Sequence, residues 1–173
     1  MKVNSLKQLY VEELRDLYDV ENQIVKALPK IVKAASTPKL REALEAHLQQ
    51  TKAHVQRLEE IFKALGEPAK AKKCDGLRGI LDEGEKTISE GVQGPVLDAG
   101  LIAGAQRVEH YEMAAYGSLK TWAAELGESQ AVRLLEETLN EEKEADKKLT
   151  EIAKGGVNAE ASRAGGKSMS AEA

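Results

Sequence analysis

The chain has 173 residues, of which 42% are hydrophobic but only 3% aromatic, and its formal net charge is −4. This length suits one domain with a substantial core, and the abundance of Ala, Leu, Glu and Lys favours helices over strands. The negative charge and the lack of a basic block argue against nucleic acid as a partner. No apolar run has the length of a signal peptide core or a membrane span, so we expect a cytoplasmic protein with no membrane partner.

Two amphipathic helices are predicted first, joined by a short loop that makes them an antiparallel hairpin. The first helix begins at a cap provided by Asn4 or Ser5 and ends before Ser36-Thr37-Pro38. The second begins there and ends at Gly66. Both carry apolar side chains at steps of three and four residues. These apolar rows are interrupted by Glu21 in the first helix and by His47, Thr51 and His54 in the second.

Residues 67–96 are predicted to form a crossover connection that contains one short helix. At about thirty residues, this segment can run the length of a bundle, as a four-helix bundle with one long crossover requires. A third long helix is predicted over residues 95–126 and a fourth over residues 129–156. We therefore expect an all-α four-helix bundle over residues 1–156. Residues 157–173 are too poor in large apolar side chains to pack well and are predicted to be a flexible tail.

Polar residues are predicted at one middle height on all four long helices. Counting residues from the turn of each predicted hairpin places Glu21 opposite residues 50–54, and Glu112 opposite Glu142. A buried carboxylate is costly unless it is paired, protonated or bound to a cation. Carboxylates and imidazoles in the core of a helical bundle are the ligand set of a di-iron or di-manganese site. The candidate metal ligands are Glu21, Gln50, His54, Glu109, Glu112, Glu142 and Asp146.

The same residues also have simpler interpretations. A single acid in an apolar row is commonly a boundary residue whose carboxylate reaches water. His47 is interpreted as a core or boundary histidine rather than a ligand, because it lies roughly two helical turns from the height of Glu21. The acids of residues 141–146 can form a merely solvated face, and Glu142 is the one among them that we select as a ligand.

Four segments, one in each long helix, carry a resemblance to a known family. They are residues 16–21, 47–51, 106–112 and 138–146, and the most specific is Val108-Glu109-His110-Tyr111-Glu112. Together they resemble the bacterial YciF/YciE stress-protein family, part of the ferritin-like superfamily, over roughly residues 5–154. The resemblance implies a ferritin-like bundle, a homodimer, a di-iron-type metal centre and a poorly defined role in stress responses.

The second helix departs from the family pattern. The family usually has Glu-Glu before the threonine, whereas this chain has Gln49-Gln50. As a ligand, Gln50 supplies only a neutral carbonyl oxygen, which should weaken metal binding and leave His54 as the main ligand from this helix. The Glu-x-x-His motif that is usual in ferritin-like proteins is also absent from the second and fourth long helices.

Three functions are consistent with the sequence. The first is a di-metal redox protein with peroxide-consuming or iron-oxidising activity, because two adjacent iron or manganese ions can share the electrons that reduce oxygen or peroxide. An oxygenase for an organic substrate is not favoured, because no segment marks a binding pocket for one. The second is a non-catalytic dimerisation or scaffold protein with a degenerate metal site. The third is metal sequestration without turnover.

Overall fold

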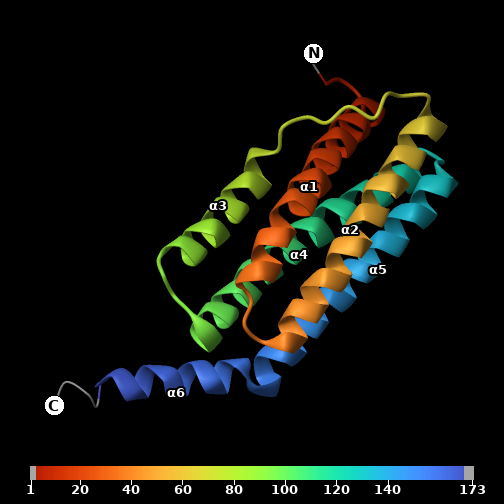
Figure 1. Cartoon of the computed structure of the whole chain (residues 1–173). Coiled ribbons are helices and arrows are strands. Elements are labelled where there is room, and N and C mark those ends of the chain that lie inside the picture. The colour runs from red at the N-terminus through yellow and green to blue at the C-terminus, as the bar shows by residue number, and fades with distance from the viewer. Residues whose placement is uncertain (1–2, 170–173) are drawn as a thin grey trace.

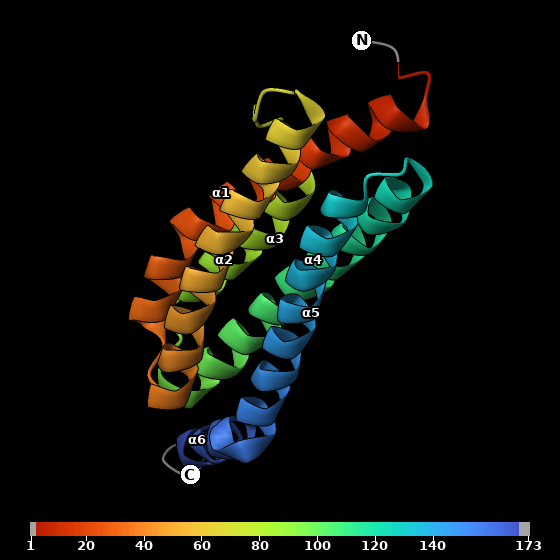
Figure 2. The same cartoon turned by 90° about the vertical axis from the view of Figure 1, so that its right-hand side faces the viewer.

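The computed structural model describes residues 3–169, and within that range the chain is helical with no strand. The long helices are α1 (Leu6–Ala34), α2 (Pro38–Leu65), α4 (Gly94–Glu125) and α5 (Ser129–Ile152). They pack in a ring in which α1 contacts α2, α2 contacts α5, α5 contacts α4 and α4 contacts α1 (Figure 1, Figure 2). Nowhere in residues 3–169 is there a helix with both the length and the apolar character that a membrane crossing requires.

Local sequence signals determine where the first two helices begin and end. The Ser5 hydroxyl accepts a hydrogen bond from the Gln8 N–H at 3.2 Å, which satisfies one of the free donors at the start of α1. Pro38 occupies the first turn of α2. Gly66 ends α2 with a φ of +69°, a left-handed conformation that favours glycine. These boundaries agree with the sequence predictions.

The connection between α2 and α4 contains α3 (Asp75–Ser89), so the predicted short helix is present. Figure 1 shows that α2 ends at one end of the bundle and α4 begins at the opposite end, so the connection runs along the bundle. Helix α3 lies against α1 and α4, and Leu77 is its one fully buried residue. The crossover therefore adds a lightly packed outer helix to one side of the core.

The part of the predicted tail that the structure describes is largely helical. A π-helical turn (Ala153–Val157) follows α5, and α6 (Asn158–Met169) then lies across one end of the bundle, where it contacts α4 (Figure 1). Val157 is buried at this junction, which gives the segment an apolar anchor that its composition does not suggest. The flexibility of the tail stays a prediction, and residues 170–173 lie outside the described residues.

Buried apolar residues occupy both ends of the core, and buried polar residues occupy its middle. Along α1, Leu14 and Leu17 lie on one side of the buried Glu21, and Ile24 and Leu28 lie on the other. The other three long helices repeat this order of apolar, polar and apolar residues. The fold therefore places a polar layer in the middle of the bundle, as the spacing of the sequence indicated, and this layer extends from His47 to His54 along α2.

A second buried acid, Asp98 on α4, binds the turn between α1 and α2. Its carboxylate is 0% exposed and accepts hydrogen bonds from the N–H and hydroxyl groups of Ser36 and Thr37, at 2.6–2.8 Å. The Thr37 hydroxyl therefore donates to Asp98 and makes no capping bond to α2. Burial alone would raise the pKa of Asp98, but the four donors outweigh it and lower the pKa.

Replacing Asp98 by alanine should lower the free energy of unfolding by about 3 kcal/mol, because it removes the charged acceptor of four hydrogen bonds. The exposed Asp82, replaced in the same way, should change it by less than about 0.5 kcal/mol. Urea denaturation at pH 7 measures both. If Asp98→Ala changed the free energy of unfolding as little as Asp82→Ala, water would be replacing the hydrogen bonds of Asp98 at no cost.

The contribution of Asp98 should also depend on pH in one direction. A carboxylate whose pKa is lowered by folding stabilises the fold above its unfolded pKa of about 3.9, and this stabilisation is lost as pH falls through the folded pKa. The stability difference between wild type and Asp98→Ala should therefore shrink as pH falls below about 4. A difference that persists unchanged down to about pH 2 would contradict this account.

Candidate metal centre

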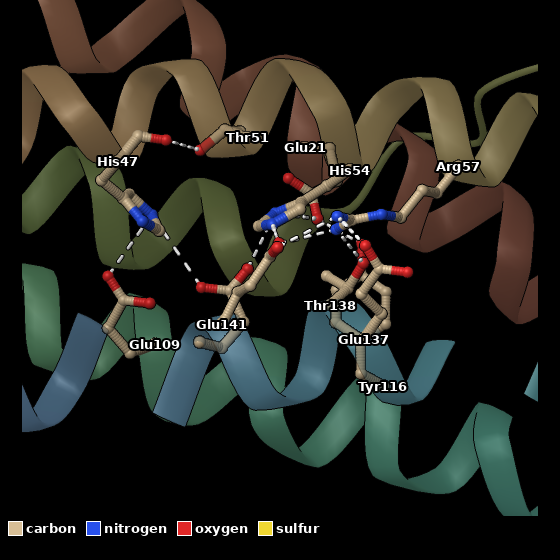
Figure 3. Close-up of polar contacts among 11 residues, drawn as sticks. Glu21, His47, Thr51, His54, Arg57, Glu109, Tyr116, Glu137, Thr138 and Glu141 are labelled. Atoms are coloured by element: carbon tan, nitrogen blue, oxygen red, sulfur yellow. Dashed lines mark hydrogen bonds and ion pairs between the residues drawn. The ribbon is translucent and has the colours of Figure 1, made fainter. Parts of the chain in front are cut away.

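Six buried residues with potential metal-binding atoms meet in the middle of the bundle. None is more than 7% exposed. Helix α1 contributes one, α2 and α4 contribute two each, and α5 contributes one. They are Glu21, His47, His54, Glu109, Glu112 and Glu142. Figure 3 shows the two histidines of α2 pointing toward acids of the other helices.

Helical spacing explains how so few helices supply so many groups. Glu109 and Glu112 are three residues apart, so both side chains leave α4 on the same face. His47 and His54 are seven residues apart, which is about two turns, so they also share a face but lie at different heights along the bundle. The site is therefore elongated along the helix axes, with one histidine toward each end.

The six residues form two overlapping groups, and in each group the potential ligand atoms lie within 4.8 Å of one another. We call the group of His47, Glu109, Glu112 and Glu142 the His47 subsite. The group of Glu21, His54 and Glu142 is called the His54 subsite.

Glu142 belongs to both subsites, and its two oxygens face different histidines. Oε1 lies 2.9 Å from His54 Nδ1, and Oε2 lies 4.0 Å from His47 Nε2. Each subsite has a further acid beside its histidine, since Glu109 Oε1 is 3.5 Å from His47 Nε2 and Glu21 Oε1 is 3.5 Å from His54 Nδ1. One carboxylate thus joins two clusters of ligand atoms, which is how an acid would bridge two metal ions.

Burial and mutual repulsion shift the pKa values of these groups. Burial raises the pKa of Glu109 and Glu112 well above the usual value for glutamate, and the charge of Glu142 adds to both shifts. Burial lowers the pKa of His47. Burial also disfavours charge on His54, but the carboxylates of Glu142 and Glu21 outweigh it and raise its pKa to about 10. In the absence of a metal ion, the raised pKa values therefore favour protonated Glu109, Glu112 and His54, and these protons reduce the repulsion among the carboxylates.

A chain of polar contacts orients His54 from outside the centre. Its Nε2 lies 2.8 Å from Glu141 Oε2, and the Arg57 guanidinium donates to both oxygens of Glu141, at 2.6 and 3.0 Å. Arg57 also donates to Glu137 at 2.6 Å and to Thr138 at 3.1 Å (Figure 3). A metal-binding histidine commonly donates its other ring N–H to a carboxylate in this way, which orients the ring. Here that arrangement leaves Nδ1 directed toward Glu21 and Glu142.

Glu21 has its own partner on the opposite side of the core. The hydroxyl of Tyr116 donates to Glu21 Oε1, and the Tyr116 ring lies 6.3 Å from the His54 ring. Burial and the charge of Glu21 raise the pKa of Tyr116 well above its usual value, so this tyrosine stays a hydrogen-bond donor at neutral pH. Tyr116 therefore holds one Glu21 oxygen in position, while the other, Oε2, has no hydrogen-bond partner in residues 3–169.

Five of the seven predicted ligands lie in the cluster, and two lie at its margin. Asp146 is half-buried, accepts a hydrogen bond from Gln106 at 2.9 Å and lies 3.4 Å from His110 Nε2, outside both subsites. Gln50 is half-buried on the wall of a cavity beside His47. Its role as a ligand stays a prediction.

The sequence interpretation missed two members of the arrangement. The expectation of a single height places His47 outside the site, whereas the observed cluster extends over two turns of α2. The seven-residue spacing of His47 and His54 was the signal that could have identified it. The sequence also predicts Glu141 to be part of a solvated acidic face. No sequence pattern predicts its contact with His54, because that contact depends on how α2 and α5 are rotated about their axes.

The donor set fits two divalent cations. Eight buried side-chain atoms of the cluster have no neighbour at full hydrogen-bond geometry within the described part of the chain, although two of them, His54 Nδ1 and Glu142 Oε1, lie 2.9 Å apart as an ion pair. An unpaired buried polar atom costs roughly 1–3 kcal/mol, so the other six favour a bound partner. Four carboxylates balance the charge of two divalent ions, and nitrogen and oxygen donors suit iron and manganese. The atoms are Glu21 Oε2, His47 Nδ1, His54 Nδ1, Glu109 Oε2, and both carboxylate oxygens of Glu112 and Glu142.

Comparison with known proteins identifies relatives of this chain. Residues 5–162 match the family model described as Domain of unknown function (DUF892). The chain is 39% identical to Protein YciF of Escherichia coli (strain K12) over 162 residues, which are 93% of this chain and 98% of YciF. The crystal structure of the E. coli stress protein YciF superimposes with a TM-score of 0.87, covering 90% of this chain and 99% of that one. YcfI from Rhodopseudomonas palustris, described as a candidate structural protein, is 42% identical with a TM-score of 0.84, covering 86% of this chain and 95% of that one.

Proposed function

This chain belongs to the DUF892 family, and from that premise we propose that it is a ferritin-like protein that binds two iron or manganese ions. The proposed ligands are the residues of the His47 and His54 subsites. The ring of four long helices with one long crossover would then be a ferritin-like four-helix bundle. In that bundle, the two hairpins bring the acids of α1, α4 and α5 around the histidines of α2.

The observation that carries this proposal is the position of Glu142 between the two histidines. Oε1 lies 2.9 Å from Nδ1 of His54, which is protonated in the metal-free protein because its pKa is raised to about 10. Oε2 lies 4.0 Å from His47 Nε2, too far for a hydrogen bond. One buried carboxylate thus faces a different imidazole on each side, and it would be able to offer one oxygen to each of two cations.

The number and type of donors support the same proposal, although their distribution is unusual. Ferritin-like di-metal proteins typically supply four glutamates and two histidines, with the histidines on two different helices. This cluster also has four glutamates and two histidines, but both histidines come from α2 and two of the glutamates come from α4. The total ligand charge is thus the same in both arrangements.

Such a centre would support a peroxide-consuming or iron-oxidising activity. Two adjacent iron or manganese ions supply the two electrons that reduce oxygen or peroxide. The chain itself would exclude water from the cluster, orient His54 through Glu141, and keep Tyr116 protonated beside Glu21. The E. coli relative is described as a stress protein, and we extend a stress-related role to this chain. The homodimer and the cytoplasmic location stay predictions.

Metal analysis tests the proposal directly. Protein purified without chelator from cells supplied with iron or manganese should contain about two metal ions per chain by mass spectrometry. If it contains no transition metal, the polar layer is structural and the scaffold function is the better description. Ferrous oxidation and peroxide consumption assays on the metal-loaded protein then separate a redox activity from metal sequestration.

The contact between Glu141 and His54 gives a more selective prediction. Glu141→Gln should weaken metal binding by about 10- to 100-fold, because it removes the charged acceptor that orients the His54 ring. Glu137→Gln is a matched control, since Glu137 also accepts from Arg57 but does not touch His54. Metal titrations of both variants measure the difference. Equal affinities would show that the carboxylate of Glu141 has no influence on the centre.

A further inference from the structure

A cavity of about 290 Å³ that opens to solvent on one side adjoins the His47 subsite, lined by α1, α2, α4 and α5 with one contact from α3. Most of its wall is formed by alkyl side chains, among them Ile24, Leu44 and Leu149. His47 and Glu109 contribute polar atoms at its buried side. Ligand pockets typically combine a largely apolar wall with a few polar groups that orient the ligand.

One atom at the buried side of the cavity still needs a partner. His47 directs Nε2 toward Glu109 and Glu142, while its other ring nitrogen, Nδ1, has no partner at full hydrogen-bond geometry among the described residues, although the neighbouring Gln50 amide acts to raise the pKa of His47. The side chain is 9% exposed, so bulk water does not readily supply that partner. A metal-binding histidine normally donates its second N–H to an oxygen, as His54 does to Glu141. A molecule in the cavity is placed to provide that oxygen to His47.

The charges around the cavity favour a neutral molecule. Glu109 lies at the buried side, and Glu144 and Lys148 lie at the exposed side, where their opposite charges offset one another. The half-buried Gln50 adds a neutral amide to that exposed side. In the metal-free protein, a carboxylate inside this largely apolar cavity would lose its hydration, and Lys148, at the exposed side, is the one lysine or arginine of its described lining.

We propose that this cavity binds a neutral, medium-chain alkyl alcohol, whose hydroxyl oxygen accepts a hydrogen bond from His47 Nδ1 and whose alkyl chain lies along the apolar wall. An apolar cavity of about 150 Å³ accommodates benzene, so the volume here suits a chain of roughly eight to twelve carbons. The site is defined by the cavity and by His47, and its occupation does not require that the metal centre be loaded. It also gives Gln50 a place at the entrance of a ligand site.

Calorimetric titration with 1-octanol tests the proposal on the full chain, both metal-depleted and loaded with manganese. Saturable one-site binding is expected in both forms, with octanoate at least tenfold weaker in the metal-depleted form. Because metal content is measured separately, a protein that binds octanol but no metal would retain this inference while losing the proposed function. A protein that binds metal but shows no saturable octanol binding would retain the proposed function and overturn this inference.

Cavity-filling variants locate the binding. Ala43→Leu on α2 and Ala145→Leu on α5 both place a larger side chain on the cavity wall and should weaken octanol binding at least tenfold. Ala53→Leu is the matched control on α2, because Ala53 does not line the cavity and should leave the affinity within twofold. Ala145 is only half-buried, so its variant keeps the test available if Ala43→Leu fails to fold. Undiminished binding in a folded cavity-filling variant, or octanoate binding to the metal-depleted protein as strong as octanol binding, would overturn the proposal.

Discussion

Glu142→Ala should remove both metal ions from the protein and lower the metal content at least tenfold. This expectation follows from its place in both subsites, where its two oxygens face different histidines. Glu109→Ala and Glu21→Ala each affect one subsite only, so each should leave about one ion per chain. Mass spectrometry of metal-loaded protein gives all three values.

The control for this series is Glu151→Ala, which removes an exposed acid from the same helix as Glu142. Its metal content should match that of the wild type. Retention of one firmly bound ion in Glu142→Ala would show that the two subsites are independent and that Glu142 does not bridge them. Retention of two ions would remove Glu142 from the ligand set altogether.

The second large effect is expected at Glu112, where one substitution should change metal binding and stability in opposite directions. Both oxygens of Glu112 are buried without a hydrogen-bond partner among the described residues, and burial raises its pKa well above the usual value. Glu112→Leu should therefore lower metal affinity, yet stabilise the metal-free protein by about 1–3 kcal/mol, because it replaces an uncompensated acid with an apolar side chain. Urea denaturation in chelator, together with metal titration, measures both effects.

The raised pKa of Glu112 also determines how the stability effect of Glu112→Leu changes with pH. An acid whose pKa is raised by folding destabilises the fold increasingly as pH rises above its unfolded value of about 4.3. The stabilisation by Glu112→Leu should therefore be larger at pH 7 than at about pH 4. Glu125→Leu, an exposed site on the same helix, should show neither effect. A chelated Glu112→Leu protein that is less stable than wild type would mean that Glu112 has bonding partners and that the polar layer is structural.

Much of the backbone was predictable because its signals are local. The cap at Ser5, the proline at position 38 and the left-handed glycine at position 66 each act on neighbouring residues, and their effects do not depend on the rest of the fold. The height of the polar layer was also predictable. In a hairpin, the distance of a residue from the turn determines which residue of the partner helix it faces, so Glu21 and Glu112 could be located from residue numbers alone.

The sequence by itself thus determined the helices, their order and the central height of the candidate site, whereas the tertiary structure decided which side chains share that site. Periodicity shows which face of a helix is apolar but not how that helix is rotated against its neighbours. The observed rotation brings His47 into the cluster and leaves Asp146 outside it, hydrogen-bonded to Gln106. Asp98 lies more than sixty residues from the turn that it binds, at Ser36 and Thr37, so no local pattern connects them. The cavity beside His47 likewise arises from packing. Its wall is formed by residues of several helices that are far apart in the sequence, so no local pattern predicts it.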